Sequence, residues 1–162
     1  MRLLLQRVRR ASVSVDGETV GEIGHGILLF IGITRGDSRE DADWLAKKAA
    51  GLRIFEDDEG RMNRSLLELE GEALVVSQFT LYADCRKGRR PGFDAAGDPA
   101  EASALYEYFV ECLRTEGVAK VATGRFGADM LVSLENDGPA TFLLSHPWEY
   151  AVTANPNAEA GQ

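Results

Sequence analysis

The sequence predicts an α+β fold in which a largely antiparallel sheet curls towards a β-barrel and two long helices pack on it. Three observations support this prediction. Short β-branched or alternating segments gather in the first third of the chain, two later segments carry apolar residues at helical spacing, and many connections are short. No repeat or linker divides the 162 residues. We therefore expect a single domain over residues 1–144 and a loosely held C-terminal extension over residues 145–162.

The opening third is predicted to be an antiparallel meander of strands. Residues 2–8 and 11–15 alternate or are β-branched, and Asp16-Gly17 is a typical two-residue hairpin turn before a return strand over residues 19–23. The apolar run over residues 27–33 is typical of a central strand that is buried on both faces.

A helix is predicted next, over residues 39–52. Ser38 followed by Asp41 resembles a capping box with an acid in place of the usual Glu. Its apolar positions recur at helical spacing: Ala42, Leu45, Ala46, Ala49 and Leu52. Residues 53–55 then predict a short strand, and the acidic segment 57–60 is interpreted as a solvated turn, because it lacks the ligand spacing of a calcium loop.

The middle of the chain predicts a buried strand that starts at Leu74 and alternates through residues 79–82. A basic loop follows it, and Pro99 then starts the second helix, which Gly117 ends. The apolar stripe of this helix consists of Ala102, Leu105, Tyr106, Phe109, Val110 and Leu113.

Three further strands complete the prediction. They cover residues 118–123, 130–135 and 140–144, and a turn formed by Asn136-Asp137-Gly138-Pro139 separates the last two. The total is about seven or eight strands.

Composition excludes several classes of protein. No apolar run approaches the roughly 18 residues of a membrane span, and Cys85 and Cys112 form no metal-binding or disulfide pattern, which fits a reducing cytosol. A net charge of −8 argues against a protein that coats nucleic acid non-specifically. Eight of the 18 Lys and Arg nevertheless lie in residues 2–10 and 86–90, so one basic face remains possible if these segments meet.

The usual catalytic groups are poorly supplied. His25 lies in a Gly-flanked turn and His146 near the C-terminus, so both are interpreted as surface residues rather than catalytic bases. Neither a nucleophile elbow, a phosphate-binding loop nor a dinucleotide motif is found. Hydroxyls, backbone amides and a Gly-Pro turn suit a reaction that needs positioning and oxyanion stabilisation, such as cleavage of an activated ester.

Two motifs carry a resemblance to a known family. Ser77-Gln78-Phe79-Thr80-Leu81-Tyr82-Ala83-Asp84, with the basic segment that follows it, resembles the first signature of the D-aminoacyl-tRNA deacylases, also called D-tyrosyl-tRNA deacylases. Asn136-Asp137-Gly138-Pro139-Ala140-Thr141 resembles their second signature, the Gly-cisPro motif. Supporting matches extend in order from about residue 1 to 144.

The resemblance implies a cytoplasmic homodimer without metal or cofactor, whose active site lies at the subunit interface. It would hydrolyse the ester that joins a D-amino acid, or mischarged glycine, to the 3′-terminal adenosine of tRNA. The implied catalytic strand contains Ser77, Gln78, Phe79 and Thr80. Two roles for Thr80 stay open, nucleophile or pocket wall, and the absence of a neighbouring base favours the wall, with the tRNA 2′-hydroxyl assisting catalysis.

The second motif implies a chirality gate. Gly138-Pro139 would enter the partner's pocket, where its carbonyls meet the α-amino group and exclude an L-side chain. Arg7 is our candidate for bracing this turn, although it would otherwise be an ordinary surface arginine. Ala140 stands where the family usually has Val, which leaves slack beside Pro139. The remaining substrate-binding candidates are Thr141 and Met130.

Phosphate contacts with tRNA are predicted for the basic loop, through Arg86, Lys87, Arg89 and Arg90. Two alternatives stay open for the whole chain. One is an RNA- or protein-binding module that keeps the fold without turnover. The other is a structural dimer whose 74–82 segment is an ordinary core strand and whose basic loop is merely solvated. Hydrolysis of D- and L-tyrosyl-tRNA distinguishes them.

Overall fold

Strand β1 (Arg2–Val15) is the centre of the fold in the computed structural model, which describes residues 1–147. It pairs antiparallel with β2 (Glu18–Ile23), β3 (Gly26–Gly32) and β8 (Leu131–Ser145). The two predicted strands 2–8 and 11–15 are thus one strand. The predicted meander order is wrong, because β1 lies between β2 and β3.

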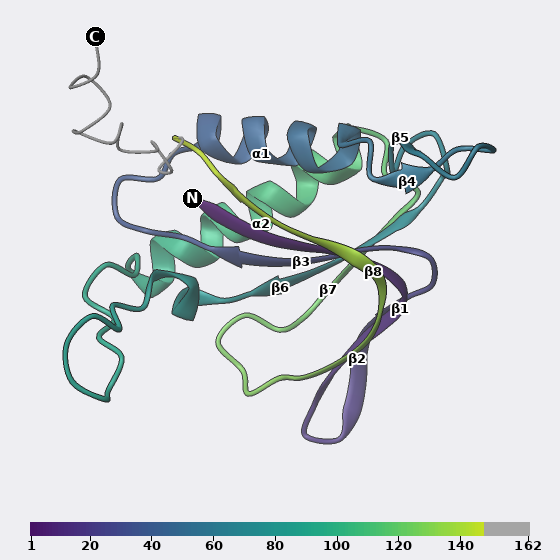
Figure 1. Ribbon diagram of the computed structural model, residues 1–162. Helices are drawn as coiled ribbons and strands as arrows, with labels where there is room; N and C mark the ends of the chain where they lie inside the picture. The colour runs from purple at the N-terminus through teal and green to yellow at the C-terminus, as the bar shows by residue number, and fades with distance from the viewer. Residues whose placement is uncertain (148–162) are drawn as a thin grey trace, which may run out of the picture.

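The far half of the main sheet is parallel. Strand β3 pairs with β6 (Glu72–Ser77), which pairs with β7 (Lys120–Thr123), both in parallel. Parallel neighbours need a crossover, and the two α-helices supply one each. The α+β class and the barrel-like curl are confirmed (Figure 1). The two edge strands of the curled sheet, β2 and β7, approach each other closely, since a Cβ on Gly21 would lie 2.5 Å from the carbonyl oxygen of Thr123.

Helix α1 (Arg39–Gly51) begins as the sequence predicts. The Ser38 hydroxyl accepts from the Asp41 backbone N–H, and the Asp41 carboxylate accepts from the Ser38 backbone N–H at 2.7 Å, which completes the capping box. Helix α2 (Pro99–Thr115) has Asp98 as its N-cap, and Gly117 follows it with φ +95°. The residues that cap these helices lie within a few positions of the helix ends, so the local sequence pattern can predict where the helices begin and end.

The main hydrophobic core lies between the sheet and the two helices, which cover the same side of it (Figure 1). Phe55 and Phe109 are among its largest fully buried side chains. Tyr106 of α2 joins the layers because its hydroxyl donates to the Val75 carbonyl at 2.9 Å, and burial raises the pKa of this phenol to about 12. A smaller core, which includes Val13, Leu28 and Leu74, fills the inside of the curled sheet.

Some predicted strands differ in extent. The strand predicted over 53–55 is reduced to β4 (Phe55–Glu56), which pairs with β5 (Met62–Arg64). The strand predicted from Leu74 ends at Ser77, and the alternating residues after it form the 3₁₀ helix η1 (Phe79–Tyr82). The reason is that β3 ends at Gly32, so the chain beyond Ser77 has no partner strand on that side.

The end of the described chain is tied to its start. Ser145 is the last residue of β8 and is buried, and His146 Nδ1 lies 2.7 Å from Asp41 Oδ1 with its ring stacked on Trp44. Ser145 and His146, the first two residues of the predicted extension, thus contact the domain, and residues 148–162 lie outside the described part. Within residues 1–147, no helix is long and apolar enough to span a membrane.

Candidate active site

The first motif is positioned by the end of the parallel pair β3–β6. The Gln78 N–H donates to the Ile31 carbonyl at 2.7 Å, which is the last backbone contact before the chain leaves the sheet. The Leu81 N–H then donates to the Gln78 carbonyl, and the Ala83 N–H donates to the Thr80 carbonyl, which folds the 3₁₀ turn. Arg2 holds this turn from β1, with Nη1 2.8 Å from the Leu81 carbonyl oxygen.

A pocket of about 300 Å³ opens beside this turn. Its walls come from the ends of β3 and β6, from the start of α2 and from two loops. The lining residues from the motif are Ser77, Gln78 and Phe79, and those opposite include Ala96, Gly97 and Phe126. Phe79 is 57% exposed and packs edge-on against Phe93, with ring centroids 5.0 Å apart. The pocket is thus mostly apolar, with the polar ends of Ser77 and Gln78 at one side.

Thr80 lies on the exposed side of η1 rather than in the lining of this pocket. Its hydroxyl accepts a hydrogen bond from the Gln78 side-chain amide. Among residues 1–147, this amide is the one side-chain group hydrogen-bonded to the Thr80 hydroxyl, and an amide cannot remove a proton. The geometry therefore supplies no general base for a Thr80 nucleophile.

The second motif forms a bulge in β8 rather than a turn between two strands. Gln6 pairs with Thr141 and Val8 with Asn136, so Arg7 alone faces residues 137–140. The Gly138–Pro139 peptide bond is cis, as the resemblance implies. The bulge is held at both ends, because β8 pairs with β1 on either side of it.

Arg7 is buried beneath this bulge, with 4% of the residue exposed, and is not a surface arginine. Its Nε donates to the Asp137 carbonyl at 2.9 Å and its Nη1 donates to the Ile54 carbonyl at 2.5 Å. The Asn136 side-chain amide donates back to the Arg7 carbonyl at 3.0 Å. Nearby, the Gln6 amide donates to the Thr141 hydroxyl at 3.1 Å. The bulge is therefore fixed by the side chains of Arg7 and Gln6 from β1 and by the side chain of Asn136 from β8.

Within one chain, the two motifs do not form one pocket. Neither Gly138 nor Pro139 lines the pocket beside η1, and Arg7, Ala140 and Thr141 do not line it either. Met130 packs instead against the smaller core inside the sheet. Ser77, Gln78 and Phe79 of the first motif thus line a pocket to which the second motif of the same chain contributes no residue.

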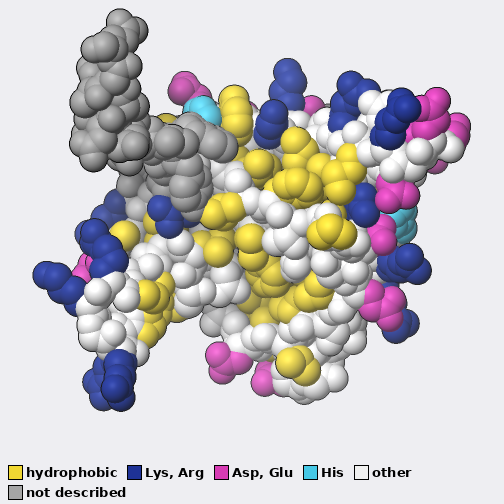
Figure 2. All heavy atoms as spheres, in the orientation of Figure 1, with side chains coloured by type: hydrophobic (Ala, Val, Ile, Leu, Met, Phe, Trp, Pro, Cys, Tyr) yellow, Lys and Arg dark blue, Asp and Glu magenta, His cyan; other side chains and the backbone are white. Residues whose placement is uncertain are grey.

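The basic loop lies between Asp84 and Gly92, which close it with two backbone hydrogen bonds of 2.8 and 2.9 Å. Arg86 turns back to Asp84, and its hydrogen bond holds the pKa of that carboxyl well below the usual range. Lys and Arg side chains project at the tip of this loop, at the lower left of Figure 2. Its free cations are Lys87, Arg89 and Arg90, which are exposed and have no ion-pair partner within residues 1–147.

The N-terminal cations do not join the loop in one basic face. Arg7 is buried, Arg9 lies near Asp137, and Arg10 pairs with Glu135 at 2.5 Å. Only Arg2 reaches η1, at the base of the loop. Of the two predicted basic segments, residues 86–90 therefore hold the exposed cations that have no ion-pair partner within residues 1–147.

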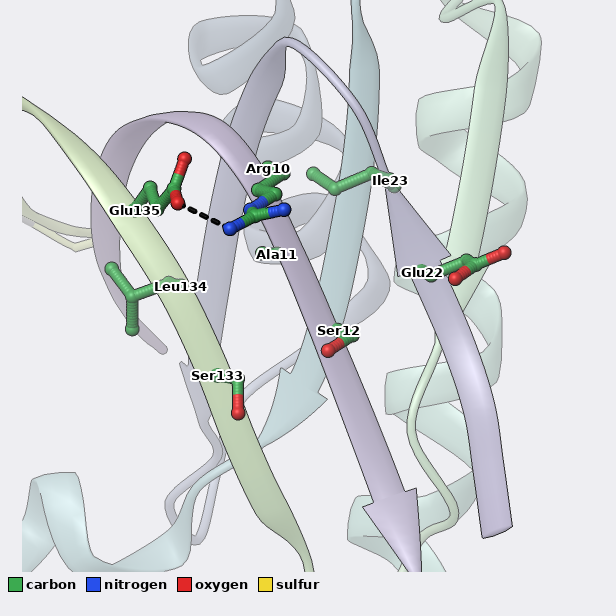
Figure 3. A pocket seen from close by; sticks show the side chains of 8 residues that line it. All are labelled: Arg10, Ala11, Ser12, Glu22, Ile23, Ser133, Leu134 and Glu135. Atoms are coloured by element: carbon green, nitrogen blue, oxygen red, sulfur yellow. Dashed lines mark hydrogen bonds and ion pairs between the residues drawn. The ribbon is translucent and has the colours of Figure 1, made fainter.

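A second hollow of about 430 Å³, which the sequence did not indicate, lies across β1, β2 and β8. Figure 3 shows its lining, in which Arg10 points to Glu135 and the hydroxyls of Ser12 and Ser133 face the same space. The cation that lines this hollow, Arg10, is thus paired with Glu135 of the neighbouring strand. None of the sequence-predicted site residues lies in this hollow.

Known proteins match most of the length of this chain. A family model described as D-Tyr-tRNA(Tyr) deacylase matches residues 4–145. The D-aminoacyl-tRNA deacylase of Geobacter sulfurreducens is 57% identical over 144 residues, which are 89% of this chain and 94% of that protein. The D-aminoacyl-tRNA deacylase of Thermomicrobium roseum is 61% identical over 144 residues, 89% of this chain and 93% of that protein.

Two solved structures have folds similar to that of this chain. A structure titled c-Myc DNA Unwinding Element Binding Protein is 40% identical, covers 91% of this chain and 99% of its own, and has a TM-score of 0.85. A probable eukaryotic D-amino acid tRNA deacylase, 22% identical, covers 88% of this chain and 97% of its own with a TM-score of 0.76, and shows the shared fold. With a model match over residues 4–145 and relatives above 50% identity, the chain belongs to the D-Tyr-tRNA(Tyr) deacylase family.

Proposed function

We propose that this protein is a D-aminoacyl-tRNA deacylase. It hydrolyses the ester between a D-amino acid, or mischarged glycine, and the 3′-terminal adenosine of tRNA, and it rejects L-aminoacyl-tRNA. The observation that carries the proposal is the family match over residues 4–145, which includes both signature motifs. The cytoplasm, where aminoacyl-tRNA is used, is the proposed location.

The active site is proposed to form between two subunits. The pocket beside η1 and the Gly138–Pro139 bulge are separate in one chain, so a single subunit offers half of the site. Strand β8 also carries exposed apolar side chains, with Leu131 71%, Leu134 37% and Leu143 38% exposed. Figure 2 shows a band of hydrophobic side chains over the region that β8 crosses. A second copy of the chain that covers this band would bring a bulge to each pocket.

In the proposed reaction, the chain positions the ester and stabilises the negative charge that develops on its carbonyl oxygen. The first residues of a helix have N–H groups without intrahelical acceptors, and no acceptor within residues 1–147 takes the N–H of Phe79 or Thr80. These two amides suit an oxyanion. Water attacks the ester carbonyl carbon, and the 3′-oxygen of the adenosine leaves and takes up a proton. The adjacent 2′-hydroxyl of the tRNA assists this proton transfer, since no base lies beside Thr80 within residues 1–147.

The partner's bulge supplies the stereochemical selection in this proposal. Its backbone carbonyls accept from the substrate's α-ammonium group, and its atoms occupy the space of an L-side chain. Selection by exclusion needs no recognition of the D-side chain, so it tolerates many D-amino acids. Glycine passes because it has no side chain to exclude.

Release of amino acid from D-tyrosyl-tRNA, L-tyrosyl-tRNA and glycyl-tRNA tests the proposal. We expect rapid release from the D-substrate and the glycyl substrate, and release from the L-substrate at the rate in buffer. If D-tyrosine is released no faster than in buffer, the deacylase proposal fails, and the alternatives are an RNA- or protein-binding module and a structural dimer. Equal D- and L-rates would contradict the exclusion argument.

The shared site is tested by mixing two variants with different defects. Gln78→Ala removes the amide that lines the pocket and should release little amino acid from either substrate, whereas Gly138→Ala distorts the bulge and should also cleave L-tyrosyl-tRNA. After dissociation and random reassociation, half of the intact pockets should face an intact bulge, so the rate on L-tyrosyl-tRNA should fall about twofold while the rate on D-tyrosyl-tRNA stays the same. If mixing leaves both rates unchanged, the two motifs do not act across subunits.

A further inference from the structure

A buried carboxylate outside both motifs lies at the turn that follows β3. The Asp37 side chain is 4% exposed, and its Oδ1 lies 2.6 Å from the Met1 ammonium. Its Oδ2 accepts the Thr34 backbone N–H at 2.8 Å, while the Asp37 N–H donates to the Thr34 carbonyl at 3.3 Å. Asp37 therefore holds the turn over residues 34–37 against the start of β1.

Thr34, which Asp37 holds, also contacts the loop before α2. Its hydroxyl donates to the Ala95 carbonyl at 2.5 Å, and its backbone forms an isolated antiparallel bridge with Ala96. The Gly97 N–H donates to the Ile33 carbonyl at 3.0 Å. Residues 95–97 are thus fastened to residues 33–34 by one side-chain bond and by backbone pairing.

This loop is a wall of the substrate pocket. Ala96 and Gly97 line it together with Gln78 and Phe79, and Ile33, which lies between the end of β3 and Thr34, lines it as well. Residues 95–97 belong to no helix or strand of their own, apart from the bridge to Thr34. Since a loop without regular structure keeps its place only through such contacts, the width of the pocket depends on Thr34 and Asp37.

We propose that Thr34 and Asp37 are positioning residues for deacylation, which set the width of the substrate pocket by holding the wall over residues 95–97. Neither side chain touches the reacting ester in this arrangement. The inference rests on the proposed function, because it takes the pocket beside η1 as the place of the aminoacyl-adenosine end.

Thr34→Val is the decisive variant, since it removes the hydroxyl but keeps the shape of the side chain and the Met1–Asp37 ion pair. Loss of one hydrogen bond corresponds to about 1 kcal/mol, so we expect KM for D-tyrosyl-tRNA to rise about fivefold while kcat changes less than twofold. Thr34→Ser, which restores the donor, should restore KM. Asp37→Asn should shift KM in the same direction, but it also unpairs a buried ammonium, so Thr34→Val decides.

Ser65→Ala is the matched control. The Ser65 hydroxyl donates to Glu68 at 2.7 Å in a turn that does not line the pocket, so this variant should lose stability without a change in KM. If Thr34→Val has the KM of the unmodified chain, or if Thr34→Ser fails to rescue it, the inference is overturned. If the unmodified chain itself releases no D-tyrosine, the proposed function fails, which is a separate outcome.

A direct binding measurement completes the test. An amide-linked analogue of D-tyrosyl-adenosine, which cannot be hydrolysed, should bind Thr34→Val about fivefold more weakly than the unmodified chain. Equal dissociation constants for the two proteins would contradict a role of Thr34 in the pocket wall.

Discussion

Arg7 and Asp137 are joined through both the backbone and the side chain of the aspartate. The Arg7 Nε donates to the Asp137 carbonyl oxygen at 2.9 Å and lies 3.2 Å from the carboxylate Oδ2. The same guanidinium donates to the Ile54 carbonyl. One buried side chain of β1 therefore links the bulge of β8 to the segment that follows α1.

Arg7→Lys tests this link. A lysine keeps the charge but cannot reach both carbonyls in the planar arrangement of a guanidinium. We expect the free energy of unfolding to fall by about 2 kcal/mol, because a buried acceptor is left unpaired, and the ratio of D- to L-deacylation to fall with it. Arg9→Lys is the control, since Arg9 also approaches Asp137 but its side chain is 75% exposed. Denaturant titration and deacylation assays should show no change for Arg9→Lys, and equal behaviour of the two variants would contradict a bracing role for Arg7.

Gly138→Ala should disturb the bulge from within. A Cβ at this position would lie 2.5 Å from the Asn136 side-chain oxygen, so the Asn136 amide that donates to the Arg7 carbonyl must move. We expect selectivity against L-tyrosyl-tRNA to fall. Gly51→Ala is the control, because its Cβ would meet nothing within 4 Å. Unchanged D-to-L ratios in Gly138→Ala would argue against the bulge as the selecting element.

Thr80→Ala should retain deacylation within about tenfold of the unmodified chain. The Thr80 hydroxyl accepts from the Gln78 amide and has no base beside it within residues 1–147, so its loss is expected to remove a contact rather than a nucleophile. A D-tyrosyl-tRNA that ends in 2′-deoxyadenosine should instead be cleaved at least a hundredfold more slowly. Single-turnover rates on both substrates decide, and normal cleavage of the deoxy substrate would refute assistance by the 2′-hydroxyl.

The salt dependence of tRNA binding should report the basic loop. Arg89 and Arg90 are exposed and unpaired within residues 1–147, so reversing both charges removes up to two phosphate contacts. The slope of log affinity against log salt should fall by roughly 1 to 2. Lys47→Glu with Lys48→Glu, an exposed pair on α1, is the control with the same change in charge. Equal slopes for the loop variant and the unmodified chain would place the loop away from phosphate.

Asp41 should make stability depend on pH in the acid range. Its burial alone would raise the pKa, but hydrogen bonds from His146 and Ser38 outweigh burial and hold the pKa below the ordinary value of 3.8. A carboxyl with a lowered folded-state pKa stabilises the fold above its unfolded pKa, and the contribution is lost as the pH falls through the folded value. The unfolding free energies of Asp41→Asn and the unmodified chain should thus differ at pH 7 and converge as the pH falls below 3.8 and through the lowered folded-state pKa of Asp41. A constant difference from pH 7 to pH 2 would exclude this linkage.

Local chemistry explains which parts of the fold the sequence predicted. The capping pair Ser38 and Asp41, and the ends of α2 at Pro99 and Gly117, are each set by residues within one turn of the helix. Residues 79–82 alternate like a strand, yet they form a 3₁₀ turn because β3 stops at Gly32 and Arg2 holds the Leu81 carbonyl. Such a contact joins residues 79 positions apart and leaves no local pattern.

Part of the candidate site could also be predicted from the sequence, and part could not. The motif residues Ser77 to Phe79 do line a pocket, and the Gly138–Pro139 peptide bond is cis, as the family resemblance implied. The burial of Arg7 was not apparent, because an arginine between apolar strand residues has the same pattern whether it faces solvent or a bulge. The roles of Thr34 and Asp37 come from contacts between the end of β3 and a loop some sixty residues later.

The bulge of β8 has one further consequence. Strand pairing with β1 continues on both of its sides, and Arg7 and Asn136 fasten it in between. Backbone pairing on both sides and two side-chain contacts in the middle therefore hold the bulge in the manner of a rigid element rather than a mobile lid. Under the proposed function, its selectivity would then depend on the space left between the bulge and the bound substrate, and not on a closing motion.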